Sequence, residues 1–451
     1  MTSDPSRHSH DDRDAMNEPR EQPVSLRSLL ERDGFAWLAG IEDTFVTAPH
    51  PTTGRTLDEY ELTGHYDVWR SDLDLMARTG VRAARCGLPW HRLNPAPGRW
   101  DFAWCDAVID RLLELGVAPV LDLVHYGVPG WIEGAFVNPD YDRHVEEYAA
   151  RVLERYGDRV DAVTPLNEPR ITAWYTGKLG WWPPYRRGWR GFFTVLVALC
   201  RGIVRVTRAI ERTPGVSAVH VDAADLYLTE VAALRPEAEQ RQAIGFLALD
   251  LVTGKVNASH PLHGKLLASG VTAAELAWFE EHAITLDFVG LNLYPLFSGK
   301  HVVARGTSSR IVMRYATATV LERLCELYHE RYGRPILITE TATEGSVARR
   351  QAWLDSSVAA VGRLRARGVP VVGYTWWPLF ALVSWAYRQS TAPVEKYLKQ
   401  MGLYDVVPRD NGELERVATP LVERYRGFAA RGGDAVGPLS QQGARAAGGG
   451  E

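Results

Sequence analysis

Two glutamates stand at the ends of short apolar runs that lie far apart in the chain. Glu168 belongs to the run Thr-Pro-Leu-Asn-Glu-Pro at 164–169, and Glu340 ends the run Pro-Ile-Leu-Ile-Thr-Glu at 335–340. A carboxylate at the rim of an apolar strand is costly unless it is hydrogen-bonded or paired, so two such positions point to one shared site. The chemistry that most needs two opposed carboxylates is glycoside cleavage, in which one protonates the leaving oxygen and the other attacks or activates water.

Composition and charge narrow the class of protein. The chain has 451 residues, of which 46% are hydrophobic and 24% charged, as in a soluble globular protein with a large core. Its 51 basic and 55 acidic side chains leave a formal charge of −4, so no general attraction to nucleic acid or to an anionic membrane is implied. We therefore expect neither nucleic acid nor a membrane as a partner, and the sequence leaves the oligomeric state open.

The cysteines and the N-terminus predict a cytoplasmic location. The N-terminus carries no apolar signal segment, and the most apolar helical stretch, 192–200, is followed by Arg201, Arg205 and Arg208, so it stays well short of the roughly 20 residues that cross a bilayer. The cysteines are Cys86, Cys105, Cys200 and Cys325. They show neither the CxxC spacing of a metal site nor the density of a disulfide framework. A reducing compartment fits this usage.

Two terminal segments differ from the rest of the chain. Residues 1–26 are rich in Asp, Arg, Ser, His and Pro, and residues 432–451 are rich in Gly, Ala and Gln with almost no large apolar side chains. Because neither segment can offset its ordering entropy by burial, we predict that both are disordered. A single folded domain is expected between them, at 27–431.

Apolar or β-rich runs recur between these ends, and most of them are separated by helix-patterned stretches. The eight runs span 35–40, 82–90, 118–126, 162–169, 216–227, 287–295, 335–340 and 371–379. The helical patterns span 104–115, 144–156, 193–211, 317–332 and 347–367. Strands that alternate with helices imply a parallel sheet, and eight such units without a break in composition predict an α/β fold, a single (β/α)8 TIM barrel.

A doubly wound open sheet is the competing architecture. It usually carries a glycine-rich phosphate turn after an early strand, and the sequence has no GxGxxG or GxxxxGK[ST] in such a context. In the barrel, Glu168 ends the fourth strand and Glu340 the seventh, so both reach the C-terminal face, where barrel enzymes place their chemistry. Two glutamates that are distant in sequence would then lie close together in space.

Six segments, in a fixed order, support a family resemblance from about Phe35 to Tyr425. Two of them contain the glutamates, and their sequences are Pro-Leu-Asn-Glu-Pro at 165–169 and Leu-Ile-Thr-Glu at 337–340. The others are Arg-Cys-Gly-Leu-Pro-Trp-His-Arg at 85–92, Leu-Val-His-Tyr-Gly-Val-Pro at 123–129, Gly-Leu-Asn-Leu-Tyr at 290–294 and Gly-Tyr-Thr-Trp-Trp at 373–377. Together they make the chain similar to glycoside hydrolase family 1, the β-glucosidase and β-galactosidase group of retaining enzymes.

The resemblance implies a role for each matched residue. Glu340 would be the nucleophile and Glu168 the acid/base of a double displacement. Arg85 and Tyr294 would support catalysis by donating to Glu340. The residues implied in substrate binding are His125, Asn167, Trp377 and Trp385. The implied mechanism needs no cofactor and no metal.

Considered without the family, these residue types also fit plainer structural roles. Arg85 could form a structural ion pair on the barrel rim, Tyr294 could be a buried aromatic with a satisfied hydroxyl, and His125 could be a hydrogen-bonded core histidine. Trp376 and Trp377 are successive strand residues, so we expect one of them to point inward and the other outward.

Three positions depart from the family pattern. Thr341-Ala342 stand where the family has Asn-Gly, Ser384 stands where it has a sugar-binding Glu, and its first-strand Gln has no clear match, with Glu42 or Asp43 in that neighbourhood. Loss of a bidentate partner would leave hydroxyls of a glucosyl or galactosyl unit unpaired, which costs strongly against those sugars. We therefore expect a hydrolase of a β-glycoside with a modified or deoxy sugar, or with a small natural-product aglycone.

Two other functions stay open on the same residues. A transglycosidase would use both glutamates with an acceptor alcohol in place of water. A glycosidase-like barrel could instead serve for ligand binding or for chemistry on a non-glycoside, with Glu168 and Glu340 kept as structural or proton-transfer groups. For the hydrolase and for the transglycosidase, the expected partner is a small-molecule glycoside.

Overall fold

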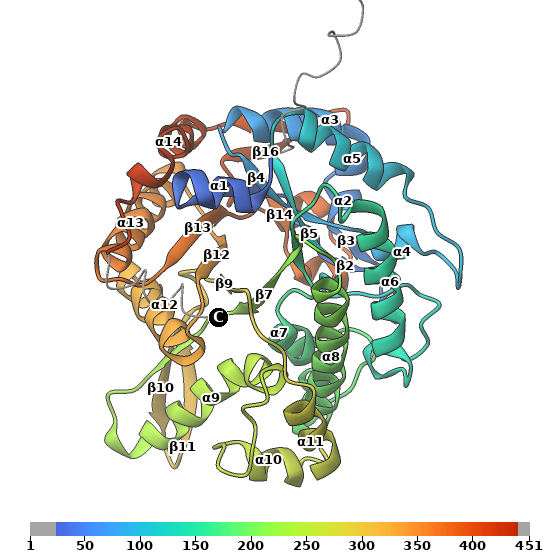
Figure 1. Cartoon of the computed structure of the whole chain (residues 1–451), viewed down its shortest axis with the longest axis vertical. Helices are drawn as coiled ribbons and strands as arrows, with labels where there is room; N and C mark the ends of the chain where they lie inside the picture. The colour runs from blue at the N-terminus through green and yellow to red at the C-terminus, as the bar shows by residue number, and fades with distance from the viewer. Residues whose placement is uncertain (1–23, 441–451) are drawn as a thin grey trace, which may run out of the picture.

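The computed structural model describes residues 24–440, and at its centre is a closed barrel of eight parallel strands (Figure 1). Their order around the barrel is β1-β13-β12-β9-β7-β6-β5-β4, and β1 closes the ring by pairing with β13 and β4. Their bounds are Ala36–Gly40 (β1), Ala83–Gly87 (β4), Ala118–Asp122 (β5), Ala162–Thr164 (β6), Ser217–Ala223 (β7), Phe288–Asn292 (β9), Ile336–Thr341 (β12) and Val371–Trp376 (β13). The predicted strands and the TIM barrel are confirmed, and the open sheet is excluded.

Small and branched side chains fill the inside of the barrel. α1 (Leu26–Asp33) adds Leu26 and Leu29 to this inner cluster. The strands contribute Ala36, Leu38, Ala83, Ala118, Val120, Ala162, Val219, Val221 and Leu337. Several of these alanines begin their strands, so α1 covers the N-terminal end of the barrel. The barrel is a packed core, and functional side chains must gather at the opposite end.

Helices cover the outside of the barrel, and a second, larger apolar cluster lies between them and the strands (Figure 1). The predicted helices are present as α5 (Ala103–Glu114), α6 (Tyr141–Tyr156), α8 (Gly188–Glu211), α12 (Ala318–Tyr332) and α13 (Val347–Ala366). The others are α2 (Glu59–Leu62), α3 (His65–Arg78), α4 (Trp90–Leu93), α7 (Pro169–Ala173), α9 (Arg235–Val252), α10 (His263–Ala268), α11 (Ala273–Glu281) and α14 (Pro420–Ala429). Within residues 24–440, no helix combines the length and the apolarity needed to cross a membrane.

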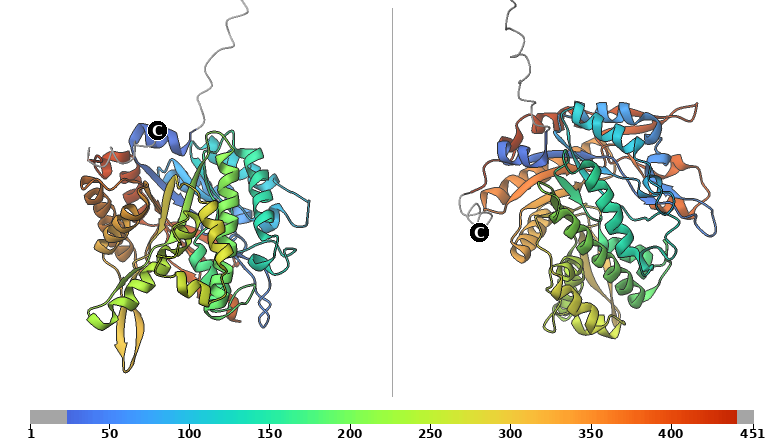
Figure 2. Two further views of the ribbon diagram at one scale, coloured as in Figure 1. Left: turned by 60° about the horizontal axis from the view of Figure 1, so that its bottom comes forward. Right: turned by 45° about the vertical axis from the view of Figure 1, so that its right-hand side comes forward.

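The sequence prediction misses the short strands outside the barrel. β8 (Leu226–Leu228), β10 (Gly299–Arg305) and β11 (Ser308–Met313) form a separate sheet, and the β10–β11 hairpin projects from the body of the molecule (Figure 2). The other pairs are β2 (Phe45–Val46) with β3 (Leu57–Asp58), β14 (Leu382–Val383) with β15 (Leu398–Lys399), and β16 (Tyr404–Pro408) with β17 (Leu414–Ala418). These strands are very short or partly exposed, so they lack the apolar run that marks a buried strand.

The folded part of the chain extends past the boundary predicted at Gly432. A 3-10 helix spans Gly432–Ala435, and the indole N–H of Trp37 donates to the Gly432 carbonyl at 2.9 Å. Val436 is only 5% exposed. The predicted start of the tail is therefore too early in the chain. Composition does not show that one buried valine and a few backbone carbonyls can hold a glycine-rich segment against the barrel. The rest of that tail and residues 1–23 lie outside the described residues.

Candidate active site

Glu168 and Glu340 both lie at the C-terminal end of the barrel, as the predicted strand order requires. Glu340 is the penultimate residue of β12, and Glu168 follows β6 as the N-cap residue of α7. Both side chains are buried, with 3% of Glu340 and 6% of Glu168 exposed. Buried carboxyl groups need hydrogen bonds or counter-charges, so their partners define what they can do.

Glu168 has a left-handed backbone conformation, with φ +46° and ψ +65°. Such a conformation costs a non-glycine residue about 1 to 3 kcal/mol and persists only where the surrounding structure holds it. Here the Glu168 N–H donates to the Val221 carbonyl of β7 at 3.2 Å, and Pro169 begins α7 directly afterwards. The backbone strain thus falls on the residue that carries the buried carboxyl.

Two donors hold the Glu340 carboxylate, one on each oxygen. Arg85 Nη1 donates to Oε1 in a buried ion pair, and the Tyr294 hydroxyl donates to Oε2 at 2.6 Å. Burial raises the pKa of Glu340 above its ordinary value, while Arg85 and Tyr294 oppose that rise by stabilising the anion. Both side chains expected to donate to Glu340 are therefore in contact with it.

Arg85 is a junction of this network, and its side chain is only 1% exposed. Besides Glu340, it pairs through Nη2 with Asp122 at the end of β5, and the same nitrogen donates to Asn167 Oδ1 at 2.7 Å. The planar guanidinium suits this arrangement because it donates in several fixed directions at once. One buried cation is thereby shared between two carboxylates and the residue that precedes Glu168.

Two asparagines connect Arg85 to Glu168. Asn292, the last residue of β9, donates through Nδ2 to Asn167 Oδ1 at 3.0 Å and to Glu168 Oε1 at 2.8 Å. The Tyr126 hydroxyl donates to the other oxygen, Glu168 Oε2. Hydrogen bonds through Arg85 and the asparagines therefore join the two glutamates in one buried network.

Glu168 differs from Glu340 in its electrostatic surroundings. Its hydrogen-bond donors, Tyr126 and Asn292, are neutral, and none of the ion pairs formed within residues 24–440 includes it. Burial raises the pKa of Glu168 to about 7, and the negative charge of Glu340 acts in the same direction. The pair thus combines a carboxylate bound to a cation with a carboxyl group that can hold a proton near neutral pH.

The hydrogen bonds around His125 define its tautomer. Because Asn167 Oδ1 accepts from Arg85, the Asn167 amide turns its Nδ2 toward His125 and donates to Nε2 at 2.9 Å. The ring proton is therefore on Nδ1, which lies 2.5 Å from Asp43 Oδ1 and 3.1 Å from Asp122 Oδ2. His125 contacts the network as a hydrogen-bond acceptor that orients Asn167.

Asp43, Asp122 and His125 also form a group whose potential metal-ligand atoms lie within 4.8 Å of one another. Sequence spacing does not reveal this group, because Asp43 follows β1 whereas Asp122 and His125 lie at the end of β5. Its potential ligand atoms already have partners within the protein, since Arg85 pairs with Asp122 and the Nδ1 proton of His125 faces both aspartates. The donor set therefore fits a charge network rather than a metal site.

The two successive tryptophans at the end of β13 face opposite ways, as predicted. Trp377 points into the site, where its ring lies 4.8 Å from the Arg85 guanidinium and is stacked on His125 with 6.0 Å between ring centroids. Trp376 belongs to the outer apolar cluster and donates through Nε1 to the Met401 carbonyl at 3.1 Å. Trp377 is thus the member of the pair that can contact a ligand.

Two further carboxyl groups lie on the β1 side of this end of the barrel. Glu42, which follows β1, accepts from the Trp377 indole N–H at 3.1 Å and from the Thr44 hydroxyl at 2.6 Å. Glu59, the first residue of α2, accepts at 2.9 Å from the backbone N–H that precedes Ser384. A carboxyl group from another segment therefore lies beside the position where the sequence lacks the family's glutamate.

The other departure from the family pattern does not displace Glu340. Thr341 Oγ1 accepts from the Trp353 indole N–H of α13 at 3.0 Å, and Ala342 is fully buried. The changed pair Thr341-Ala342 packs toward the outer helix layer. Glu340 keeps both of its donors.

Trp385 reaches the site through aromatic packing. Its ring centroid lies 5.0 Å from that of Trp182 and 5.1 Å from those of Tyr126 and Tyr175. Tyr126, which also has a left-handed backbone with φ +72°, connects this aromatic cluster to Glu168 through its hydroxyl. The cluster therefore forms a wall on the Glu168 side of the site.

Sequence reasoning missed three residues of the network, namely Asn292, Asp122 and Tyr126. Asn292 and Tyr126 belong to the segments 290–294 and 123–129 that support the family resemblance, so the motifs contained the signal. Asp122 is an acidic residue at the end of an apolar strand, which is the feature that identified Glu168.

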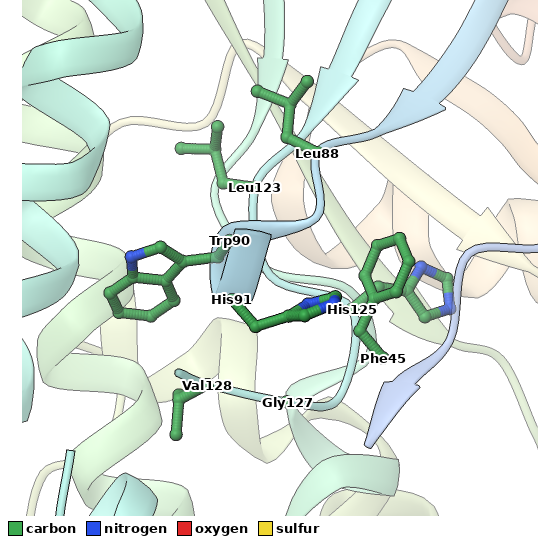
Figure 3. Close-up of a pocket in the computed structure, with 8 residues that line it drawn as sticks. All are labelled: Phe45, Leu88, Trp90, His91, Leu123, His125, Gly127 and Val128. Carbon is green, nitrogen blue, oxygen red and sulfur yellow. The ribbon is translucent and has the colours of Figure 1, made fainter. Parts of the chain in front are cut away.

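A narrow hollow adjoins the network on the side of β4 and β5 (Figure 3). Its lining residues are Phe45, Leu88, Trp90, His91, Leu123, His125, Gly127 and Val128. It shares His125 with the network, but most of its other walls are apolar. The hollow therefore lies beside the network of Glu168 and Glu340, and its lining contains no Lys, Arg, Asp or Glu side chain.

Comparison with known proteins identifies the family and the fold of the chain. The model of the family described as Glycosyl hydrolase family 1 matches residues 33–296, more than half of the 451 residues. The chain is 24% identical over 429 residues to beta-glucosidase 47 of Arabidopsis thaliana, a match that covers 81% of this chain and 75% of that protein. It is 32% identical over 143 residues to the bifunctional beta-D-glucosidase/beta-D-fucosidase of Bifidobacterium breve, covering 30% of this chain and 31% of that protein.

Matches to several other curated relatives are local, and they span between 24% and 33% of the length of those proteins. Among solved structures, the beta-glucosidase from Thermotoga maritima in complex with azafagomine has a TM-score of 0.77 at 20% identity, covering 89% of this chain and 98% of that chain. This likeness shows the same fold. On the match of its sequence to the family model, the chain belongs to glycosyl hydrolase family 1.

Proposed function

We propose that this protein is a retaining glycosidase that cleaves a β-glycoside, with Glu340 as the nucleophile and Glu168 as the acid/base. The proposal rests on the contrast between two buried carboxyls in one hydrogen-bond network. Glu340 is paired with Arg85, whereas Glu168 has neutral donors and a pKa raised to about 7. A glycosidase needs such a pair, one carboxyl ionised and the other protonated.

The reaction follows as a double displacement. In the first step a Glu340 oxygen attacks the anomeric carbon, the bond to the leaving oxygen breaks, and Glu168 gives its proton to that oxygen. In the second step Glu168 takes a proton from water while the water oxygen attacks the same carbon and the bond to Glu340 breaks. Two inversions give retention. Arg85 and Tyr294 orient Glu340 for the attack, and they donate to its carboxylate again when the second step releases it.

The same geometry supports substrate-binding roles for the other residues. Asn167 precedes Glu168, and a bond from its amide to the sugar 2-hydroxyl would tighten in the oxocarbenium-like transition state. His125 orients that amide through Nε2. Trp377 presents its ring at the site and can stack on an apolar sugar face, and Trp385 adds the aromatic wall.

The proposed substrate carries a deoxy or otherwise modified sugar, or a small natural-product aglycone. At position 384 the chain offers a serine hydroxyl where the family pattern has a carboxylate. The relative from Bifidobacterium breve is named as a β-glucosidase and β-D-fucosidase, and fucose is a 6-deoxy sugar. A site with fewer partners for distal hydroxyls favours such sugars over glucose, because it leaves fewer polar groups unpaired.

We also propose a cytoplasmic location and a small-molecule glycoside as the partner. All four cysteines are buried and free, which fits a reducing compartment. The double displacement uses protein side chains and water, so the proposal includes no cofactor.

Covalent trapping tests the proposal. A panel of 2-deoxy-2-fluoro glycosides with activated leaving groups, including glucosyl, fucosyl and 6-deoxyglucosyl donors, should label the protein once, and peptide mapping should place the label on Glu340. The matched control is Glu340→Ala, which should stay unlabelled. NMR of the first-formed sugar should show the β anomer, because two displacements retain the configuration of a β-glycoside.

Other outcomes of this experiment identify other functions. An α product would mean inversion and would contradict the nucleophile role of Glu340. A transfer product that exceeds the hydrolysis product when an alcohol is added would identify a transglycosidase. Absence of label across the panel, together with tight binding of a sugar ligand, would identify a binding barrel.

A further inference from the structure

Glu42 is a buried carboxyl group without a countercharge. Its side chain lies at the ligand end of the barrel and is 6% exposed. Its hydrogen-bond donors are the Trp377 indole N–H and the Thr44 hydroxyl, and none of the ion pairs formed within the described part of the chain includes it. Each oxygen of Glu42 accepts one of these hydrogen bonds, and both donors are neutral.

Glu59 adds a second carboxyl group next to Glu42. It is fully buried, its Oε2 accepts from a backbone N–H, and its Oε1 has no hydrogen-bond partner among residues 24–440. Burial raises the pKa of Glu59 well above its ordinary value, and the charge of Glu42 acts in the same direction. An oxygen that is buried and unpartnered beside an unpaired carboxylate marks a place where a donor is missing.

The strand order separates this pair from the residue proposed as the acid/base. Glu42 follows β1, which is flanked by β13 and β4, and β6 with Glu168 lies three strands away around the ring. Glu168 must be at the glycosidic oxygen to act as the acid. Glu42 therefore lies away from the bond that is cleaved, and the ring carbons farthest from that bond are C3 and C4.

Resting on the proposed glycosidase function, we propose that Glu42, backed by Glu59, binds a protonated amino group on the sugar, so that the substrate class is the glycosides of 3-amino or 4-amino sugars. An ammonium group donates up to three hydrogen bonds and neutralises a buried anion, which a neutral hydroxyl cannot do. A buried charge without a partner is costly, and a cationic substrate removes that cost when it binds.

The test compares matched substrates on matched variants. The substrates are the 4-nitrophenyl β-glycosides of 3-amino-3-deoxyglucose, 4-amino-4-deoxyglucose and glucose, assayed below the pKa of the sugar amine. Glu42→Gln removes the charge but keeps an oxygen that can accept from the Trp377 indole N–H and a polar nitrogen beside the Thr44 hydroxyl. Glu61→Gln removes a charge from an exposed glutamate on α2, whose side chain is 66% exposed, and serves as the control.

We expect the wild type to have a kcat/KM at least about 100-fold higher for one of the amino glycosides than for the glucoside. Glu42→Gln should abolish this preference, because it should lower kcat/KM for the amino glycoside about 100-fold more than for the glucoside. Glu61→Gln should leave both values unchanged. Equal losses for amino and neutral substrates in Glu42→Gln would overturn the inference and assign Glu42 to hydroxyl binding.

The failure of this inference can be separated from failure of the proposed function. If the fluorosugars label Glu340 but the amino glycosides are poorer substrates than the glucoside, the proposed function stands and the inference is wrong. If no glycoside is cleaved and no label forms, the proposed function fails. Calorimetry of the intact amino glycosides then decides the inference alone, since tight binding that Glu42→Gln abolishes would support it and equal binding by both proteins would contradict it.

Discussion

The two sides of the carboxyl cluster differ in how their charge is compensated. On the side of Glu168 and Glu340, one guanidinium and two asparagine side chains join Glu340, Asp122 and Glu168 in a hydrogen-bond network that contains a cation. On the β1 side, Glu42 has neutral donors only, and Glu59 has one oxygen without a partner. A buried cation can keep one carboxyl group of the reacting pair ionised, whereas carboxyl groups without a cation leave a charge that a ligand can neutralise. The difference indicates that reactivity and substrate choice reside on separate sides of one site.

Glu340→Ala should have the largest effect on activity, because it removes the nucleophile from the side of Glu168 and Glu340. Removal of the nucleophile should lower kcat by about five orders of magnitude, because the first displacement has no other carboxylate in position. The measurement is release of 4-nitrophenol at saturating substrate. Glu281→Ala, at a side chain 78% exposed, is the control and should retain full activity. Residual activity within tenfold of wild type would contradict the assignment.

Glu168→Gln should change the pH dependence as well as the rate. A general acid must be protonated to act, and the pKa of Glu168 is raised to about 7, so wild-type kcat/KM should fall as pH rises above about 7. The variant should lose this alkaline limb and about 10² to 10⁴ in rate on substrates with poor leaving groups. The loss should be smaller for 4-nitrophenyl glycosides, which depart without a proton. An alkaline limb that survives in the variant would assign the titration to another group.

Ser384→Glu should have the smallest effect, a change in stability that tests the surroundings of Glu59. The new carboxyl would lie beside Glu59, which already accepts from the backbone N–H preceding position 384, so repulsion should lower the free energy of unfolding by about 1 kcal/mol. The double variant Ser384→Glu/Glu59→Gln should recover most of this loss, because one of the two charges is removed. Urea unfolding measures both. Strictly additive effects would show that the two positions do not interact.

The sequence reveals the barrel because each of its strands is buried on both faces and therefore reads as an apolar run. Glu168 and Glu340 stand out because they interrupt such runs, and the alternation of Trp376 and Trp377 follows from strand geometry. The sequence does not tell which tryptophan points inward, since that depends on the placement of β13 between β1 and β12. The unpaired state of Glu42 is also invisible in the sequence, because it depends on which side chains fail to reach it.

Closure of the ring has a consequence for how the protein is made. Arg85 is synthesised 255 residues before its partner Glu340, and β1 must wait for β13 before its second edge is covered. A domain that emerges from the ribosome N-terminus first therefore lacks one of the two carboxylate partners of Arg85 and has an open sheet edge until nearly the whole chain is available. Premature termination after β9 would yield a chain with neither nucleophile nor closed sheet, which would be prone to aggregate rather than to act as a smaller enzyme.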